Sequence, residues 1–248
     1  ASDFPFRRGD GRFQVRLDAR DVTLNYKPGW PVAHGLNGNV AFDGARLGVI
    51  ADGHIFGAHV KRVDVRIADL DRPVLRLSGS ARGPVDDFLR YVRESELGED
   101  HADVLARFSG DGEAELELEV REPLSDRLST AGYVRGEVAL HDARLNVARG
   151  VSFEQLNGTL RFDDVQFTSR GLEGKLLGGP VRVTVYSSGD RTTQIALRGT
   201  MEGKRLAGLG DSPVFSRFEG RAGWQAVLIL PHQSDRSETV FRLRSDLK

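Results

Sequence analysis

Polar and apolar residues alternate along most of the chain. In residues 113–120 the alternation is unbroken, with glutamates on one side and, on the other, Ala114, Leu116, Leu118 and Val120. Because successive side chains of a β-strand point to opposite faces, a period of two predicts strands with one apolar and one polar face. Similar runs are separated by turn residues such as Asp-Gly and Ser-Gly-Asp. They predict about a dozen strands with mainly antiparallel neighbours.

One stretch departs from this period. Pro84 suits the first turn of a helix, and Val85, Phe88, Leu89 and Val92 follow it at helical spacing. We therefore predict a helix over about residues 84–96. A second short helical turn is expected over residues 102–108.

The chain also resembles itself at an interval of about 120 residues. The tripeptide at residues 36–38, Leu-Asn-Gly, recurs at residues 156–158, and further short matches follow in the same order. We interpret residues 1–124 and 125–248 as two copies of one β unit, the first including the helix near residues 84–96. A repeated β unit with one apolar face needs its neighbours to extend that face.

The predicted fold class is therefore mainly β: a curved antiparallel sheet forming an open, repeating β-groove, with one or two short helices. A sandwich in which a second sheet closes the apolar side is the alternative. In the open version the alternating apolar residues line the groove. These are Phe13, Val15, Leu17, Leu24, Tyr26, Val40, Phe42, Val63, Val65, Ile67, Leu116, Leu118, Val138, Leu140, Leu145, Val147, Leu160, Phe162, Val183, Val185, Ile195, Leu197, Trp224 and Leu228.

Charge and cysteine content exclude several classes of protein. The formal net charge is −1, and 35 Lys and Arg are interspersed with 36 Asp and Glu. A nucleic-acid binder needs a basic surplus for its phosphate contacts, so nucleic acid is not an expected partner. The chain has no cysteine, which excludes disulfides, thiol catalysis and the usual ligands of structural zinc.

No catalytic motif or cofactor site stands out. His54 and His59 lie five residues apart, and on a single strand they would point to opposite faces, so we expect no metal site there. The acidic pairs Asp86-Asp87 and Asp163-Asp164 fit a helix start and a hairpin, respectively. We therefore predict no enzyme activity, no metal and no cofactor.

Particular sequence elements resemble one known family. They include the opening Phe-Pro-Phe at residues 4–6, Gly-Trp-Pro at residues 29–31, the Leu-Asn-Gly element at residues 36–38, and Gly-Ser-Ala-Arg-Gly-Pro at residues 79–84 before the predicted helix. In these features the chain resembles the YhdP-type branch of the AsmA-like proteins. The likeness covers most of the chain and is strongest over residues 4–165.

The resemblance implies a function that composition alone does not give. Proteins of this family are long, are anchored in the inner membrane by an N-terminal helix, cross the periplasm of Gram-negative bacteria, and are implicated in moving phospholipid between the two membranes. This chain would be an interior, periplasmic segment of such a protein. Its expected partners are phospholipid acyl chains, and both membranes through other parts of the full-length protein. The family offers no catalytic residues.

Other functions fit the same pattern of strands. A structural or interaction module would use the apolar face as a closed core. A chaperone-like groove in outer-membrane biogenesis would accept unfolded strands at a sheet edge. A glycan-active β domain would need converging carboxylates.

Overall fold

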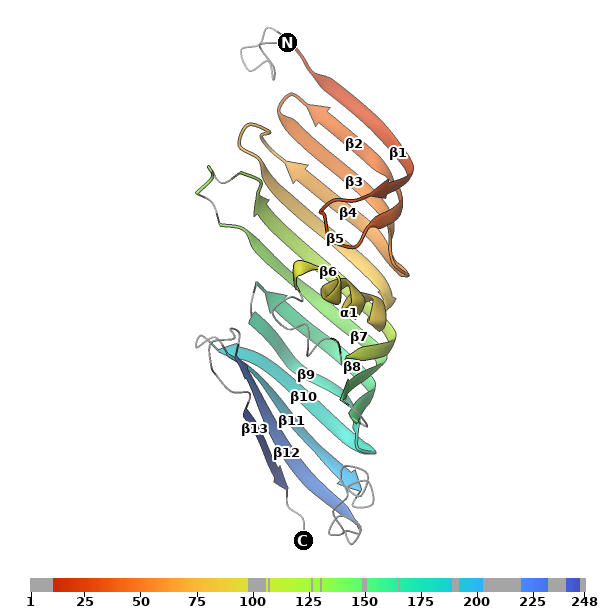
Figure 1. Cartoon of the computed structure of the whole chain (residues 1–248), viewed down its shortest axis with the longest axis vertical. Coiled ribbons are helices and arrows are strands. Elements are labelled where there is room, and N and C mark those ends of the chain that lie inside the picture. The colour runs from red at the N-terminus through yellow and green to blue at the C-terminus, as the bar shows by residue number, and fades with distance from the viewer. Residues whose placement is uncertain are drawn as a thin grey trace. The chain divides into compact units, whose positions relative to one another are not determined.

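The fold is an antiparallel β-sheet with one helix in the part of the chain that is described. The computed structural model describes residues 11–97, 106, 108–125, 127–129, 131–148, 151–164, 166–188, 192–202, 220–231 and 240–245. Within these residues 13 strands form one sheet whose spatial order follows the chain from β1 to β13, without closing into a barrel (Figure 1). The predicted fold class is confirmed.

The chain divides into two compact units. Unit 1 comprises Ala1–Gly83 and Glu115–Gly136, and unit 2 comprises Pro84–Ala114 and Glu137–Lys248. The strands of unit 1 are β1 (Gln14–Leu24), β2 (Ala33–Asp43), β3 (Arg46–Ile55), β4 (Ala58–Ile67) and β5 (Val74–Pro84), with parts of β6 (Ser109–Pro123) and β7 (Tyr133–Ala148). Unit 2 holds the rest of β6 and β7, α1 (Val85–Arg93), β8 (Val151–Asp163), β9 (Gln166–Leu176), β10 (Gly179–Ser188), β11 (Thr192–Glu202), β12 (Arg221–Pro231) and β13 (Val240–Ser245).

Tight turns explain why consecutive strands pair. Leu177 and Gly178 join β9 to β10 with φ values of 54° and 77°. Two central residues with positive φ are the mark of a type I′ turn, whose twist matches that of the strands it joins. Gly44, with φ of 57°, connects β2 to β3 in the same region of φ. These turns leave room only for antiparallel neighbours.

Residues with positive φ occur inside several strands, and four of them are found at matching places in the two units. Asp21 in β1 and Asp142 in β7 have φ values of 52° and 48°, and Gly35 in β2 and Gln155 in β8 have values of 60° and 51°. The pairing of β1 with β2 shifts register between Ala19 and Val22, an interval that contains Asp21, and again between Val22 and Leu24. Such shifts are expected for β-bulges. An extra residue in a strand exchanges the faces to which odd-numbered and even-numbered residues point. The apolar positions of β1 change there from odd numbers to even numbers.

The same hydrogen bonds hold these bulges in both units. The backbone N–H of Asp21 donates to Oδ1 of Asn37 at 3.1 Å, and that of Asp142 donates to Oδ1 of Asn157 at 2.8 Å. The Nδ2 groups of the two asparagines donate to the carbonyls two residues earlier, at 3.0 and 2.9 Å. The Leu-Asn-Gly element found in the sequence therefore has one structural role at both of its occurrences. The proposed boundary of the copies at residue 124 stays a prediction.

The helix confirms the expected change of period and is shorter than predicted. α1 covers Val85–Arg93, with Pro84 as its N-cap residue and Asp86 and Asp87 in its first turn, where carboxylates favour the helix dipole. The side chain of Arg93 donates to the carbonyl of Phe108 at 2.7 Å, which ties the end of the helix to the start of β6. Most of the second predicted helical turn, at residues 102–108, lies outside the described residues.

The cluster of buried apolar residues that pack together belongs to unit 2. Val85 of α1 packs there with Ala114, Ala143 and Leu156, and Phe88 and Leu89 pack against the same cluster. The other buried members come from β9 to β12: Leu172, Leu176, Val181, Val183, Val185, Met201, Trp224 and Ala226. The helix thus covers the face of β6 and β7 that carries the two alanines (Figure 1).

Candidate functional site

The candidate site is one face of the five consecutive strands β1 to β5. Their registers align apolar positions into three rows, and each row crosses all five strands. Cross-strand partners point to the same face of a sheet. The rows are Val15–Phe42–Leu47–Ile67–Leu75, Leu17–Val40–Val49–Val65–Leu77 and Ala19–Gly38–Ala51–Val63–Gly79. We call this set the apolar face of unit 1.

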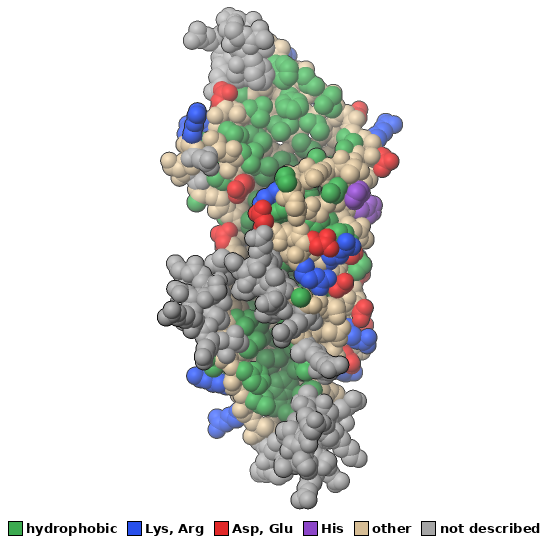
Figure 2. Space-filling view, viewed as in Figure 1, with side chains coloured by type: hydrophobic (Ala, Val, Ile, Leu, Met, Phe, Trp, Pro, Cys, Tyr) green, Lys and Arg blue, Asp and Glu red, His purple; other side chains and the backbone are tan. Residues whose placement is uncertain are grey.

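The apolar face of unit 1 is only half-buried. Leu17 keeps 53% of its surface exposed, whereas Ile67, at 6%, is the most buried of the larger side chains in the rows. The cluster of buried apolar residues lies in unit 2, and of the residues in these three rows only Ile67 is buried. Figure 2 shows hydrophobic side chains gathered over these strands. A contiguous apolar surface of this kind usually marks a binding site.

The dimensions of the rows follow from sheet geometry. Neighbouring strands lie about 4.8 Å apart, so a row across five strands spans about 19 Å. Half of the hydrocarbon core of a bilayer is about 15 Å thick. The apolar face of unit 1 is therefore long enough for an extended acyl chain lying across the strands.

The opposite face of the same strands is polar. The charged residues that alternate with the apolar rows point the other way, and they include Arg16, Asp18, Asp64, Arg66 and Arg76. Arg66 donates to both carboxylate oxygens of Asp64 at 2.8 Å, and this bonding raises the pKa of Arg66. In a sheet with one charged and one apolar face, water solvates the charged face while the apolar face stays available for contacts.

The other predicted residues of unit 1 extend or flank these rows. Phe13 precedes β1, and its ring makes an edge-on contact with Phe42 at 6.4 Å between centroids. Leu24 lies beyond the bulge of β1 and is exposed. Tyr26 lies in the connection after β1 and contacts Trp30 edge-on at 6.4 Å. On β6 the predicted alternation holds, and Leu116 and Leu118 are half-buried.

In unit 2 the predicted residues divide into buried and half-buried groups. Val183, Val185 and Trp224 are members of the buried cluster. Partly buried residues that pack against it are Val138, Leu140, Leu160, Ile195 and Leu197. Leu228 pairs with Ile195, Phe162 pairs with Phe167, and Leu145 and Val147 are half-buried. Their assignment to a lipid groove stays a prediction.

Sequence reasoning missed four residues at the centre of the apolar face of unit 1. Leu47 and Val49 of β3 and Leu75 and Leu77 of β5 lie in its first two rows. In β3 the alternation is obscured because Ile50, next to Val49, is apolar although it points to the polar face. Pairing of this strand with its neighbours, rather than its own pattern, would have identified it.

The expected separation of His54 and His59 is wrong. The two residues end β3 and begin β4 on either side of a hairpin turn, and they are direct partners in the register. Partners share a face, so their rings lie 4.9 Å apart at the centroids. The described residues nevertheless contain no group of three or more His, Cys, Asp or Glu side chains placed to hold a metal ion.

Comparison with known proteins places this sheet in a family. The family model described as YhdP protein matches residues 1–248. The chain belongs to the YhdP family. Over 252 aligned residues it is 23% identical to the intermembrane phospholipid transporter YhdP of Escherichia coli K12, an alignment that covers 99% of this chain and 20% of that protein. The chain therefore spans about a fifth of the length of this YhdP relative.

Two further findings concern solved structures and membrane-spanning helices. No solved structure matches this chain. Among the described residues no helix is both long and apolar enough to cross a bilayer. The membership in the YhdP family confirms the resemblance seen in the sequence.

Proposed function

We propose that this chain is a non-enzymatic segment of an intermembrane phospholipid conduit, and that the apolar face of unit 1 shelters acyl chains. The observation that carries the proposal is the set of three apolar rows in which only Ile67 is buried. The class of ligand comes from the name of the YhdP relative, an intermembrane phospholipid transporter. In this proposal the chain lies in the periplasm, and other parts of the full-length protein meet the inner and outer membranes.

The energy of such a site follows from burial alone. Each methylene removed from water contributes about 0.8 kcal/mol, so about 12 methylenes contribute on the order of 10 kcal/mol. That gain offsets the loss of contact with the bilayer. Because the contacts are non-directional, the free energy of a bound chain changes little along the rows. A lipid held in this way is shielded from water without being trapped at one position.

The chemistry of the rows also explains what they exclude. They present no charged side chain, so a phosphate headgroup would stay at the rim, where water solvates it. The charged residues that alternate with the rows, such as Arg16, Asp64 and Arg76, lie on the other face. In the proposed arrangement, acyl chains therefore lie against the apolar face of unit 1 and headgroups remain in water.

Adjacent residues of β3 provide a matched test. A photoreactive amino acid at Val49, in the middle row, is expected to crosslink phospholipid when the chain is mixed with phosphatidylethanolamine and phosphatidylglycerol vesicles. The same amino acid at Ile50, which is 43% exposed on the polar face, is the control. Mass spectrometry of the adducts should show lipid at Val49 and little at Ile50. Equal crosslinking at both positions, or none at Val49, contradicts the proposal.

A substitution separates binding from folding. Val65→Asp places a carboxylate in the middle row between Val49 and Leu77. Lipid capture should fall at least about tenfold while the circular dichroism spectrum keeps its β signal, because an exposed face tolerates a charge that a core would not. Retained lipid capture would contradict the proposal. Capture of unfolded outer-membrane protein strands in place of lipid would favour the chaperone-like alternative.

A further inference from the structure

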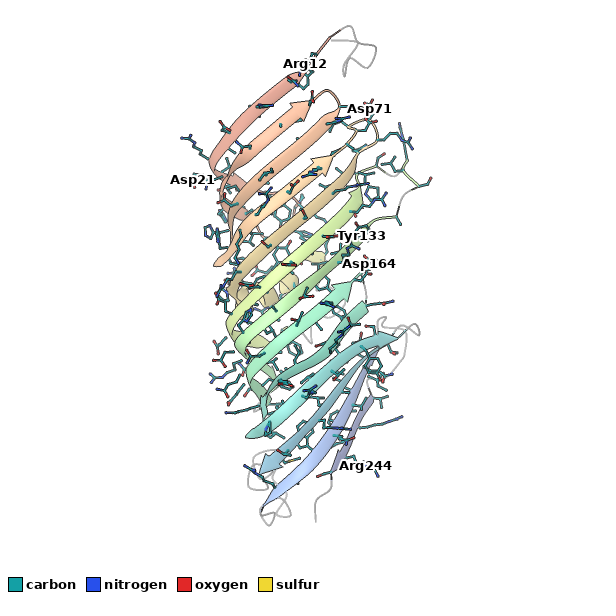
Figure 3. All side chains as sticks on the ribbon, turned by 180° about the vertical axis from the view of Figure 1, so that it is seen from behind. Arg12, Asp21, Asp71, Tyr133, Asp164 and Arg244 are labelled. Carbon is teal, nitrogen blue, oxygen red and sulfur yellow. The ribbon has the colours of Figure 1, made fainter. Side chains whose placement is uncertain are left out.

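The polar face of unit 1 contains a cavity of about 420 Å³ that the lipid proposal does not use. Four neighbouring strands, β4 to β7, contribute to it. Its charged and aromatic lining consists of Asp64, Arg66, Arg76, Glu119, Arg121 and Tyr133 (Tyr133 is labelled in Figure 3). The cavity lies within unit 1, and its charged residues Asp64, Arg66 and Arg76 alternate with Val65 and Leu77 and therefore point to the opposite face of the sheet.

Both carboxylates of the cavity are already neutralised. Arg66 holds Asp64 with two hydrogen bonds of 2.8 Å. Arg135 holds Glu119, with its Nε 2.8 Å from the carboxylate, and the same guanidinium lies 5.2 Å from the centre of the Tyr133 ring. Each acidic group therefore has its own arginine, and neither is left to balance further positive charge.

Two arginines remain as a positive surplus. Arg76 and Arg121 have no ion-pair partner among the described residues. Arg76 lies directly opposite Arg66 in the register of β4 and β5, and like charges in that position repel each other. The Nε of Arg121 is out of contact with water and has no hydrogen-bond partner. A buried donor without an acceptor is unfavourable, so the protein leaves the guanidinium of Arg121 incompletely satisfied.

We propose that this cavity binds a phosphate-class oxyanion, as a free phosphate or as the phosphodiester of a lipid headgroup. Arg121 and Arg76 would donate to its oxygens, because planar guanidinium groups match the geometry of phosphate and form charge-assisted hydrogen bonds with it. The oxyanion would balance the charge of Arg121 through the terminal guanidinium nitrogens and would screen the repulsion between Arg76 and Arg66. The site lies on the opposite face from the acyl-chain site, so each can fail without the other.

The test is a titration of the chain with three probes: inorganic phosphate, glycerol 3-phosphate and short-chain phosphatidylglycerol below its micelle concentration. The wild type should bind at least one of them, and Arg121→Gln should weaken that binding about tenfold or more. Arg121→Lys keeps the charge but loses the planar fork, so it should restore part of the affinity. The matched control is Arg16→Gln, on the polar face but outside the cavity, which should bind as the wild type does.

A second measurement uses only the wild-type protein, so it does not depend on the folding of a variant. In the wild type, the NMR resonance of the Arg121 Nε–H should shift when the probe is added. Tighter binding of the lipid than of inorganic phosphate assigns the site to a headgroup, and equal binding assigns it to a free phosphate. The proposal is overturned if no probe shifts this resonance, or if Arg121→Gln binds as tightly as the wild type.

Discussion

The two units use the same alternating pattern to make different surfaces. In unit 2 the apolar side of the sheet is a buried core: Ala143 is 0% exposed, Leu156 is 2% exposed, and α1 packs against them. In unit 1 the corresponding side is three half-exposed rows of side chains. An apolar row becomes a core or a binding surface according to whether another element covers it. Unit 2 therefore supplies folding free energy, and unit 1 supplies the open face.

A buried charge should give the largest difference between the units. Leu156→Asp puts an unpaired carboxylate into the core of unit 2 and should lower the free energy of unfolding by at least about 4 kcal/mol. Leu36→Asp, at the same place in the repeated Leu-Asn-Gly element but half-buried, should lower it by about 2 kcal/mol or less. Urea unfolding followed by tryptophan fluorescence measures this, because Trp224 reports on unit 2 and Trp30 on unit 1. Equal losses would remove the distinction between core and open face.

Removing the cover should turn part of unit 2 into an open face. Phe88→Ala on α1 should lower the free energy of unfolding by about 2 kcal/mol and raise the fluorescence of the dye ANS, because apolar residues beneath the helix become accessible. The control on the same helix is Arg90→Ala, which breaks an exposed ion pair with Glu94 and should change little. Unchanged dye binding in Phe88→Ala would show that α1 is not the cover.

The bulges should be equally important in both units. Asn37→Ala and Asn157→Ala each remove two hydrogen bonds, and each should lower the free energy of unfolding by about 1–2 kcal/mol. Hydrogen exchange should speed up at the amides of Asp21 and Asp142, respectively. Asn39→Ala removes only an exposed side-chain contact with Asp18 and should leave the Asp21 amide protected. An effect in one unit alone would contradict a shared structural role.

The smallest change in stability is expected on the open face. Leu17→Gln should alter the free energy of unfolding by less than about 0.5 kcal/mol, because the side chain is already 53% exposed. The same substitution should reduce dye binding, since it removes apolar surface that the dye can reach. Thermal unfolding and ANS fluorescence measure both. A loss above about 1 kcal/mol would mean that this part of unit 1 is covered in solution.

Local patterns predicted most of the secondary structure for a clear reason. In β6, for example, glutamates alternate with Leu116 and Leu118. This alternation is sufficient to identify a strand with one solvent-exposed face. The repeated Asn37 and Asn157 were also visible, because each donates to a carbonyl two residues earlier within the same short segment. Pairing across strands was less visible. His54 and His59 face each other because a hairpin turn lies between them, which their spacing does not reveal.

The sequence by itself determined that the sheet has one oily and one charged side, since period-two alternation fixes the direction of every side chain once a strand forms. The structure added the bulges at Asp21 and Asp142, which reverse the alternation in β1 and β7 so that apolar residues stay on one side. Only the tertiary structure decided which part of the oily side is closed. α1 carries an apolar stripe that could cover any similar surface, and its attachment to β6 places it over Ala114 and Ala143 in unit 2. Covering depends on contacts between distant segments, and no local pattern contains that information.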